Sequence, residues 1–405
     1  MENNKVIPQL RFPGFKGDWE KKKFKDITFP AGKKNSQNLP YERYSISNEV
    51  GFYPQSDQFE DGGGYLKDID CRQYIVVPPK SFAYNPARIN VGSIGYQDLG
   101  KEVIVSSLYE VFQTKADCDD SFLWQWFHTD IFRKMVVNVQ EGGVRQYFYY
   151  EKLKDCVILL PSISEQRRIA ECLDSLDQMI SAQEQKVEVL TEKKKGLMQE
   201  LFPQSGESTP RLRFPGFTGE WEQRMLGEVF EKNNERNTDC SIGFDKTISI
   251  ASMTYNPSGN GAAEDSLKTY KVLRIGDIAF EGHKNKDFAY GRFVMNDIGP
   301  GIISPRFTSL RPKCPLEVEF WKKLINYEPI MRSKLVNSTK MGTMMNELIV
   351  SEVLKQSLPV PTLAEQQKIA SCLSSLDDTI RAETDKLETL KNHKRGLLQQ
   401  LFPQP

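Results

Sequence analysis

The sequence predicts an α/β (α+β) chain in which two globular domains are joined by two long antiparallel coiled-coil helices, with a pseudo-twofold, circular organisation. Two observations predict this architecture. The motif LRFPGF, followed by a tryptophan, begins at residue 10 and again at residue 212. A segment over 160–204 with helical periodicity returns without gaps over 360–404. Because such a repeat decides the architecture, it is considered before any local pattern.

The repeated segments predict two helices of close to forty residues each. Their apolar side chains recur at alternating spacings of four and three, which is typical of a coiled-coil seam. Ser162 or Ser164 supplies the first N-cap and Thr362 the second, and Pro203 and Pro403 end the helices. At about 1.5 Å per residue each helix is a rod of roughly 55–60 Å. The expected seam residues are Ile169, Leu173, Leu176, Ile180, Val187 and Leu190 in the first helix, and Ile369, Leu373, Leu376, Ile380, Leu387 and Leu390 in the second.

Polar residues interrupt both seams. Gln183 and Lys194 stand at seam positions of the first helix, and Glu383 and Lys394 stand at those of the second. Polar residues at such positions cost stability but fix the register and orientation of two helices. The alternative is that the helices diverge at these positions toward the globular domains.

The chain therefore divides into four segments. A first globular domain covers 1–160, a first helix 161–204, a second globular domain 205–360 and a second helix 361–405. If the helices run antiparallel, the C-terminal LFPQP returns beside the N-terminal PQLRFPGF. An old duplication without symmetric purpose is the alternative explanation of the repeat.

Composition and motifs exclude several classes of function. The 405 residues carry 54 Lys plus Arg against 54 Asp plus Glu, so the overall charge does not indicate a polyanion partner. Apolar runs are too short to span a bilayer, and we expect a cytoplasmic protein without a membrane partner. There is no GxxxxGK[ST], GxGxxG or HExxH, and the three histidines are scattered. We therefore expect no catalysis, no metal and no cofactor bound by this chain.

The repeated frame, which consists of the two LRFPGF motifs and the two helical segments, resembles the specificity subunit of type I restriction-modification systems. The resemblance rests on the LRFPGF…W openings, the helix starts P…EQ..IA..L..LD..I and the endings K.GL.Q.LFP, in this order and twice. It covers essentially the full chain. It implies that each globular domain is a target recognition domain that reads one half of a bipartite, asymmetric site in double-stranded DNA. It also implies that the helices act as a ruler and as a docking surface.

The resemblance implies partners as well. Two methyltransferase (modification) subunits are expected on the helices and DNA, and a restriction subunit with motor and nuclease activity is expected to join them. S-adenosylmethionine, ATP and Mg are then expected on those partner subunits and not on this chain.

Candidate DNA contacts follow from side-chain chemistry, because Arg, Lys, Asn, Gln and similar side chains on loops read base edges or bind phosphate. Strand-like stretches precede two of these loops, over 74–84 and 272–280. The candidates in the first domain are Lys33, Lys34, Asn35, Asn85, Arg88, Asn90, Arg145 and Gln146. Those in the second domain are Tyr255, Asn256, His283, Lys284, Asn285, Lys286, Arg292, Arg306, Lys340 and Thr343.

Two rival functions fit parts of the same sequence. A non-catalytic coiled-coil adaptor with two protein-binding heads would have the repeats and the neutral charge. A cryptic enzyme is the other rival, and it would bind a cofactor on its own.

Overall fold

The computed structural model of the chain describes residues 7–48, 51–58, 70–140, 147–258, 264–283, 285–342 and 345–403. It divides into two compact units, of which unit 1 is Met1–Glu184 with Asp385–Pro405 and unit 2 is Gln185–Thr384. Each unit takes one globular domain and a part of each long helix. The four segments expected from the sequence stay a prediction.

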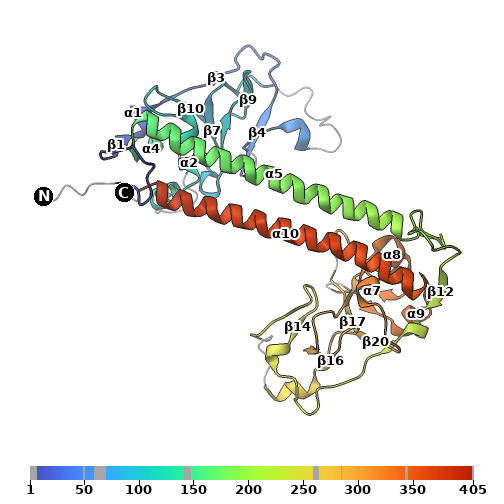
Figure 1. Cartoon of the computed structure of the whole chain (residues 1–405). Helices are drawn as coiled ribbons and strands as arrows, with labels where there is room; N and C mark the ends of the chain where they lie inside the picture. The colour runs from blue at the N-terminus through green and yellow to red at the C-terminus, as the bar shows by residue number, and fades with distance from the viewer. Residues whose placement is uncertain are drawn as a thin grey trace. The chain divides into compact units, whose positions relative to one another are not determined.

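Unit 1 is built around a four-stranded antiparallel sheet in the order β2-β10-β7-β8 (Figure 1). A three-stranded sheet β3-β6-β9, a β4–β5 hairpin and the pair β1–β11 complete its strands. The strands are β1 (Glu20–Lys23), β2 (Thr28–Pro30), β3 (Lys33–Lys34), β4 (Tyr44–Ser47), β5 (Gly51–Pro54), β6 (Ile75–Val77), β7 (Ser81–Tyr84), β8 (Ile94–Gln97), β9 (Val103–Val105), β10 (Glu110–Thr114) and β11 (Val157–Leu160). The helices are α1 (Phe24–Ile27), α2 (Asp120–Phe127), α3 (Asp130–Gln140), α4 (Tyr150–Leu153) and the start of α5 (Ile163–Leu201).

Unit 2 repeats this topology with a different sequence. Its four-stranded sheet has the order β13-β20-β17-β18, and β12 pairs with β23 as β1 pairs with β11. The strands are β12 (Glu222–Met225), β13 (Phe230–Lys232), β14 (Ile248–Ser249), β15 (Thr254–Tyr255), β16 (Lys271–Leu273), β17 (Ile278–Glu281), β18 (Arg292–Met295), β19 (Gly301–Ile303), β20 (Ser309–Pro312), β21 (Thr339–Lys340), β22 (Glu347–Leu348) and β23 (Ser357–Val360). The helices are α6 (Leu226–Val229), α7 (Val318–Leu324), α8 (Glu328–Val336), α9 (Val350–Leu354) and the start of α10 (Leu363–Leu401).

The repeated LRFPGF motif holds the start of one long helix in each unit. The Arg11 guanidinium forms two hydrogen bonds of 2.8 Å with the Glu165 carboxylate in the first turn of α5. Arg213 does the same with Glu365 in the first turn of α10, at 2.7 and 2.8 Å. The carboxylates are buried, with side chains 2 % and 1 % exposed. Such bidentate, charge-assisted pairs are strong and geometrically specific.

The same motif also contacts the end of the other long helix. In unit 1 the Leu10 N–H donates to the Gln400 carbonyl of α10 at 3.0 Å, and in unit 2 Leu212 donates to the Glu200 carbonyl of α5 at 2.9 Å. The expected return of the C-terminal helix to the N-terminal motif is thereby confirmed. The motif glycine Gly14 has a φ of +95°, a backbone conformation that favours glycine.

A buried tryptophan completes each frame. Trp19 packs edge-on against Phe402 at 6.4 Å between ring centroids, and Trp221 packs edge-on against Phe202 at 6.3 Å. These phenylalanines belong to the LFPQ endings of the long helices. Each domain core therefore includes the end of one long helix and the start of the other.

The helix parts run antiparallel within each unit. In unit 1, Lys394 binds Asp177 at 2.5 Å, and Lys391 binds Glu184 at 2.8 Å, so residue numbers rise along α5 as they fall along α10. In unit 2, Lys194 pairs with Asp377 at 2.5 Å and Glu383 with Lys186 at 2.5 Å.

The predicted seam residues are all buried or half-buried. Of these residues, Ile169, Leu173, Leu176, Ile369, Leu373 and Leu387 are buried, and Ile180, Val187, Leu190, Leu376, Ile380 and Leu390 are half-buried. Three of the polar interruptions, Lys194, Glu383 and Lys394, form ion pairs between the helices, so they are not points of divergence. Gln183, the fourth, is itself buried.

We predict that Arg11→Ala lowers the free energy of unfolding of unit 1 by about 3 kcal/mol, because it leaves the buried Glu165 carboxylate without its partner. Denaturant unfolding of the full chain measures this. Arg133→Ala is the control, since its exposed pair with Asp130 contributes at most about 1 kcal/mol. Equal losses in the two variants would contradict the structural role of the motif.

Candidate nucleic-acid interface

Two equivalent loops follow equivalent strands in the two domains. The loop after β7 begins at Asn85 and the loop after β17 at Gly282, and each leads into the next strand of its four-stranded sheet. The Phe148 N–H donates to Pro86 O at 3.0 Å, and the Asn346 N–H donates to Gly282 O at 2.9 Å. In each domain, a later segment therefore lies against the same loop.

In the first domain this loop carries Arg88 and Asn90, both exposed. Asn85 is half-buried, and its Oδ1 accepts from the Ala87 N–H at 2.9 Å, so it shapes the turn at the start of the loop. The structure thus places two candidate side chains on the outside of the loop and one in its framework.

Two tyrosines beside this loop were not among the candidates chosen from the sequence. Tyr147 and Tyr149 are each 46 % exposed, and their rings stack with centroids 5.5 Å apart. Phe148 and Tyr150 alternate with them and are buried in the core. The alternation in the sequence YFYY was the available signal, because it places every second ring outside.

The candidates Lys33, Lys34 and Asn35 lie elsewhere, on and after β3 in the three-stranded sheet. Both lysines are exposed, and Lys34 bonds Gln73 at 3.0 Å. Asn35 is 3 % exposed, and its side chain exchanges two hydrogen bonds of 2.9 Å with the Leu39 backbone. Its amide is used to hold a turn, so we withdraw Asn35 from the candidate contacts.

In the second domain, the equivalent loop carries His283, Asn285 and Lys286, all exposed. The His283 ring Nδ1 lies 2.6 Å from the Glu281 carboxylate, which orients the ring. Asn285 Oδ1 accepts from the backbone N–H groups of residues 287 and 288, so this amide shapes the loop as Asn85 does.

Arg292 closes the same loop at the start of β18. Its guanidinium donates to the Ala251 carbonyl at 2.7 Å and lies 5.2 Å from the centroid of the Phe288 ring. It therefore joins the loop to the segment around residue 251. We interpret Arg292 as a residue that positions the loop.

The remaining candidates are spread over the second domain. Tyr255 donates its hydroxyl to Pro300 O at 3.0 Å, and Lys246, not selected from the sequence, lies 4.5 Å from its ring centroid. Asn256 is half-buried, and Arg306 and Lys340 are exposed. Arg145, Gln146, Lys284 and Thr343 lie outside the described residues.

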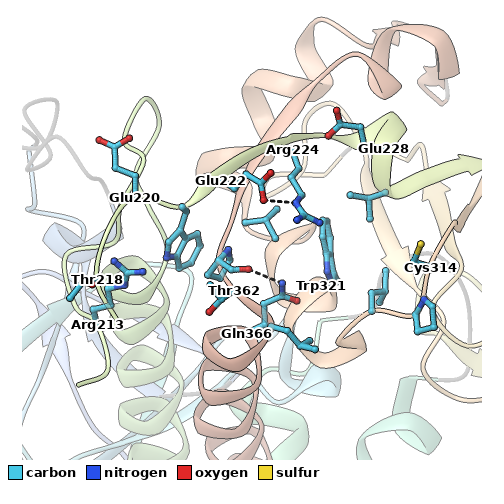
Figure 2. Close-up of a pocket in the computed structure, with 17 residues that line it drawn as sticks. Arg213, Thr218, Glu220, Glu222, Arg224, Glu228, Cys314, Trp321, Thr362 and Gln366 are labelled. Atoms are coloured by element: carbon cyan, nitrogen blue, oxygen red, sulfur yellow. Dashed lines mark hydrogen bonds and ion pairs between the residues drawn. The ribbon is translucent and has the colours of Figure 1, made fainter. Parts of the chain in front are cut away.

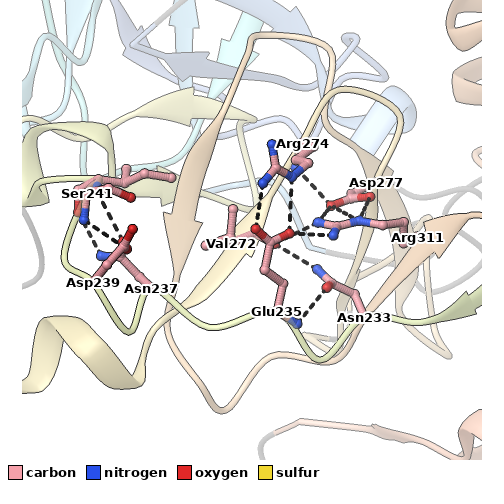
Figure 3. Close-up of polar contacts among 10 residues, drawn as sticks. Asn233, Glu235, Asn237, Asp239, Ser241, Val272, Arg274, Asp277 and Arg311 are labelled. Atoms are coloured by element: carbon pink, nitrogen blue, oxygen red, sulfur yellow. Dashed lines mark hydrogen bonds and ion pairs between the residues drawn. The ribbon is translucent and has the colours of Figure 1, made fainter.

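An ion-pair network in the second domain joins Glu235, Arg274, Asp277 and Arg311 (Figure 3). Arg274 binds the Glu235 carboxylate at 2.6 and 3.1 Å, and Arg311 binds both Glu235 and the buried Asp277. The hydrogen bonds from Arg274 and Arg311 lower the pKa of Glu235 to about 2. The network ties Glu235, in the segment after β13, to Arg274 and to Arg311 of β20.

Two further structural observations concern only the described residues. Among them no group of three or more His, Cys, Asp or Glu could hold a metal ion. No helix in this described part is both long and apolar enough to cross a membrane.

Comparison with known proteins identifies the family. The model of the type I restriction modification DNA specificity domain matches residues 16–192 and again 218–392. The chain belongs to this family of type I restriction-modification specificity subunits. The resemblance seen in the sequence is thereby confirmed, and the two matches coincide with the two repeats.

Two relatives match over nearly their whole length. The chain is 26 % identical to the type I restriction enzyme MjaVIII specificity subunit of Methanocaldococcus jannaschii, covering 99 % of this chain and 95 % of that protein. It is 24 % identical to the putative MjaX specificity subunit of the same organism, covering 95 % and 93 %. The crystal structure of a type I restriction-modification S subunit from M. genitalium has the same fold, with a TM-score of 0.59 at 14 % identity, covering 98 % of this chain and 99 % of that one.

We predict that Glu235→Gln lowers the stability of unit 2 at neutral pH by about 1–2 kcal/mol, a figure that allows for the partial exposure of the network. Because the folded-state pKa lies below the ordinary value of about 4.3, this contribution is present above about pH 4.5 and is lost as the pH falls toward 2. Unfolding measured between pH 2 and 7 should show a weaker pH dependence in the variant. Glu231→Gln, an exposed neighbour on β13, is the control. Parallel curves for Glu235→Gln and the wild type would contradict the role of the network.

Proposed function

We propose that this chain is the non-catalytic DNA-specificity subunit of a type I restriction-modification complex, and that each domain reads one half of a bipartite, asymmetric site. One observation carries the proposal: the two domains share a topology and a frame, but their equivalent loops after β7 and β17 present different side chains. Two domains that share one fold but carry different loops are suited to reading two different half-sites.

The loop chemistry suits base recognition in the major groove. Arg88 and Asn90 in the first domain offer the donors and acceptors that guanine and adenine edges pair with. His283 and Lys286 offer a different set in the second domain. Since the chain carries no net charge, we expect much of the phosphate contact, and so of the affinity, to come from partner subunits.

In this proposal, the helices act as a ruler that sets the distance between the two half-sites. Helices α5 and α10 are 39 residues each, which corresponds to about 58 Å at 1.5 Å per residue. Successive turns of B-DNA present the same face about 34 Å apart. The ion pairs between the helix parts favour one register, and a fixed register would fix the number of unread base pairs between the half-sites.

The partners in the proposal are two methyltransferase subunits and a restriction subunit, acting in the cytoplasm. S-adenosylmethionine, ATP and Mg belong to those subunits, and the present chain contributes sequence recognition and a scaffold. If the chain were instead an adaptor that binds only proteins, it would give the assembled complex no sequence-specific affinity for DNA.

We predict that Arg88→Ala weakens binding of the assembled complex to its cognate duplex by about 10- to 100-fold, since a good base contact contributes about 1–3 kcal/mol of discrimination. The loss of affinity should coincide with relaxed sequence selectivity at one half-site only. His283→Ala should relax the sequence selectivity at the other half-site. Competition binding with duplexes substituted in either half-site measures both effects. Arg133→Ala, an exposed cation of α3, should leave binding unchanged. Relaxation of both half-sites by a single loop variant would contradict one domain reading one half.

A further inference from the structure

In each unit, one aspartate of a long helix contacts the other long helix and the globular domain at the same time. In unit 1, Asp177 of α5 accepts hydrogen bonds of 2.5 and 2.7 Å from the Lys394 ammonium of α10. It also accepts a hydrogen bond of 2.8 Å from the Gln125 side chain of α2. Three helices therefore meet at one carboxylate, and we call these residues, Gln125, Asp177 and Lys394, the first joint.

The second joint, in unit 2, consists of Lys323, Asp377 and Lys194. Asp377 of α10 binds the Lys194 ammonium of α5 at 2.5 Å, and its other carboxylate oxygen binds Lys323 of α7. Burial alone would raise the pKa of Asp377, but the hydrogen bonds from Lys194 and Lys323 prevail and lower it. The carboxylate is therefore ionised at neutral pH.

Gln125 and Lys323 occupy the same place in the two domains. Each lies three residues after a phenylalanine, Phe122 or Phe320, whose ring packs against the buried tryptophan of its unit at 6.0 and 6.1 Å between centroids. Gln125 is 0 % exposed and Lys323 is 9 % exposed. A buried amide in one domain and a buried ammonium in the other thus make the same contact.

The surroundings of the two joints differ in where an additional carboxylate lies. Three residues before the joint aspartate, unit 1 has Asp174 and unit 2 has Ser374. Asp174 accepts a second hydrogen bond from Gln125 at 2.9 Å, whereas Ser374 donates to Glu319 of α7 at 3.3 Å. The contact between domain and helix is kept while the residues that make it differ, which favours a role for the contact itself.

The joints add direction to the packing of each domain on its helices. In unit 2, for example, α7 and the first turn of α10 lie side by side, and Trp321 and Gln366 line one cleft there (Figure 2). Apolar packing of this kind is not directional. Hydrogen bonds, in contrast, require donor–acceptor distances of about 2.7–3.2 Å.

A wrong gap in the DNA would demand a larger displacement than the joints permit. We use gap for the run of unread base pairs between the two half-sites. One base pair more or fewer moves a half-site by about 3.4 Å and rotates it by about 35°, since a turn of about 34 Å holds about ten base pairs. A domain that followed this displacement against its helices would break its joint and leave buried polar groups unpaired, which is costly.

We propose that the two joints are positioning sites, which fix each domain on the helices beside it and thereby make the complex reject DNA whose gap is one base pair too long or too short. The ion pairs between the helices set the register of the helices, whereas Gln125 and Lys323 set the position of the domains on them. This inference rests on the proposed function and assigns its gap selectivity to contacts between domain and helix.

Competition binding of the assembled complex tests the proposal with three duplexes, which carry the cognate gap, one base pair more and one fewer. Gln125→Met and Lys323→Met keep the length of the side chain and remove its donor. Each should lower the preference for the cognate gap about 10-fold, the factor expected for one lost hydrogen bond to a charged group. Discrimination against duplexes substituted within a half-site should stay unchanged. Lys323→Arg, which keeps a cationic donor, should retain the wild-type gap preference.

Lys322→Met and Gln113→Met are the matched controls. Lys322, the neighbour in α7, pairs with Asp297 of its own domain, and the Gln113 amide donates to the Pro79 carbonyl at 3.1 Å. Both controls should keep the wild-type gap preference. Either unit alone suffices for the test, since Gln125→Met and Lys323→Met change separate joints.

The outcomes separate the joints from the proposed function. An unchanged gap preference in Gln125→Met and Lys323→Met, or an equal loss in the controls, would overturn the positioning role. Equal binding of all three gaps by the wild type would overturn it as well. A wild-type complex that shows no preference for any half-site sequence would instead overturn the proposed function.

Discussion

The architecture depends on one interaction, the buried ion pair between the motif arginine and the first-turn glutamate of a long helix. Arg11 with Glu165, and Arg213 with Glu365, fix where a domain ends and a helix begins. Because the same motif also donates a backbone hydrogen bond to the end of the other helix, both helices are tied to each domain. Losing the arginine would leave a buried carboxylate unpaired, which is far more costly than losing an exposed pair.

This arrangement separates what is constant from what varies. The frame and the helix seams recur with similar chemistry, whereas the domain interiors and the loops after β7 and β17 do not. The domains nevertheless keep one fold, and even a turn whose sequence differs between them recurs. The Asn237 side chain forms two hydrogen bonds with the Ile242 backbone, as the Asn35 side chain does with the Leu39 backbone. Under the proposed function, a constant scaffold with variable loops would allow recognition to change without changing assembly.

The sequence predicted the frame and the helices well, because heptad spacing and a duplicated motif are local patterns. The common fold of the domains could not be predicted, since equivalent core positions hold different residues, such as Phe112 and Leu310. Asn35 was expected to contact DNA, because the sequence does not distinguish an asparagine whose amide holds a turn from one whose amide reads a base. The place of the stacked Tyr147 and Tyr149 beside the loop after β7 depends on how distant segments meet, which no local pattern contains.

Under the proposed function, two domains of one chain read two different half-sites. The decisive measurement is methylome sequencing of a host that carries this chain with its methyltransferase and of the same host lacking only this chain. One bipartite, asymmetric methylated motif should appear only when the chain is present. Unchanged methylation, with the complex shown to assemble, would rule out the reading of two half-sites and favour an adaptor that binds only proteins.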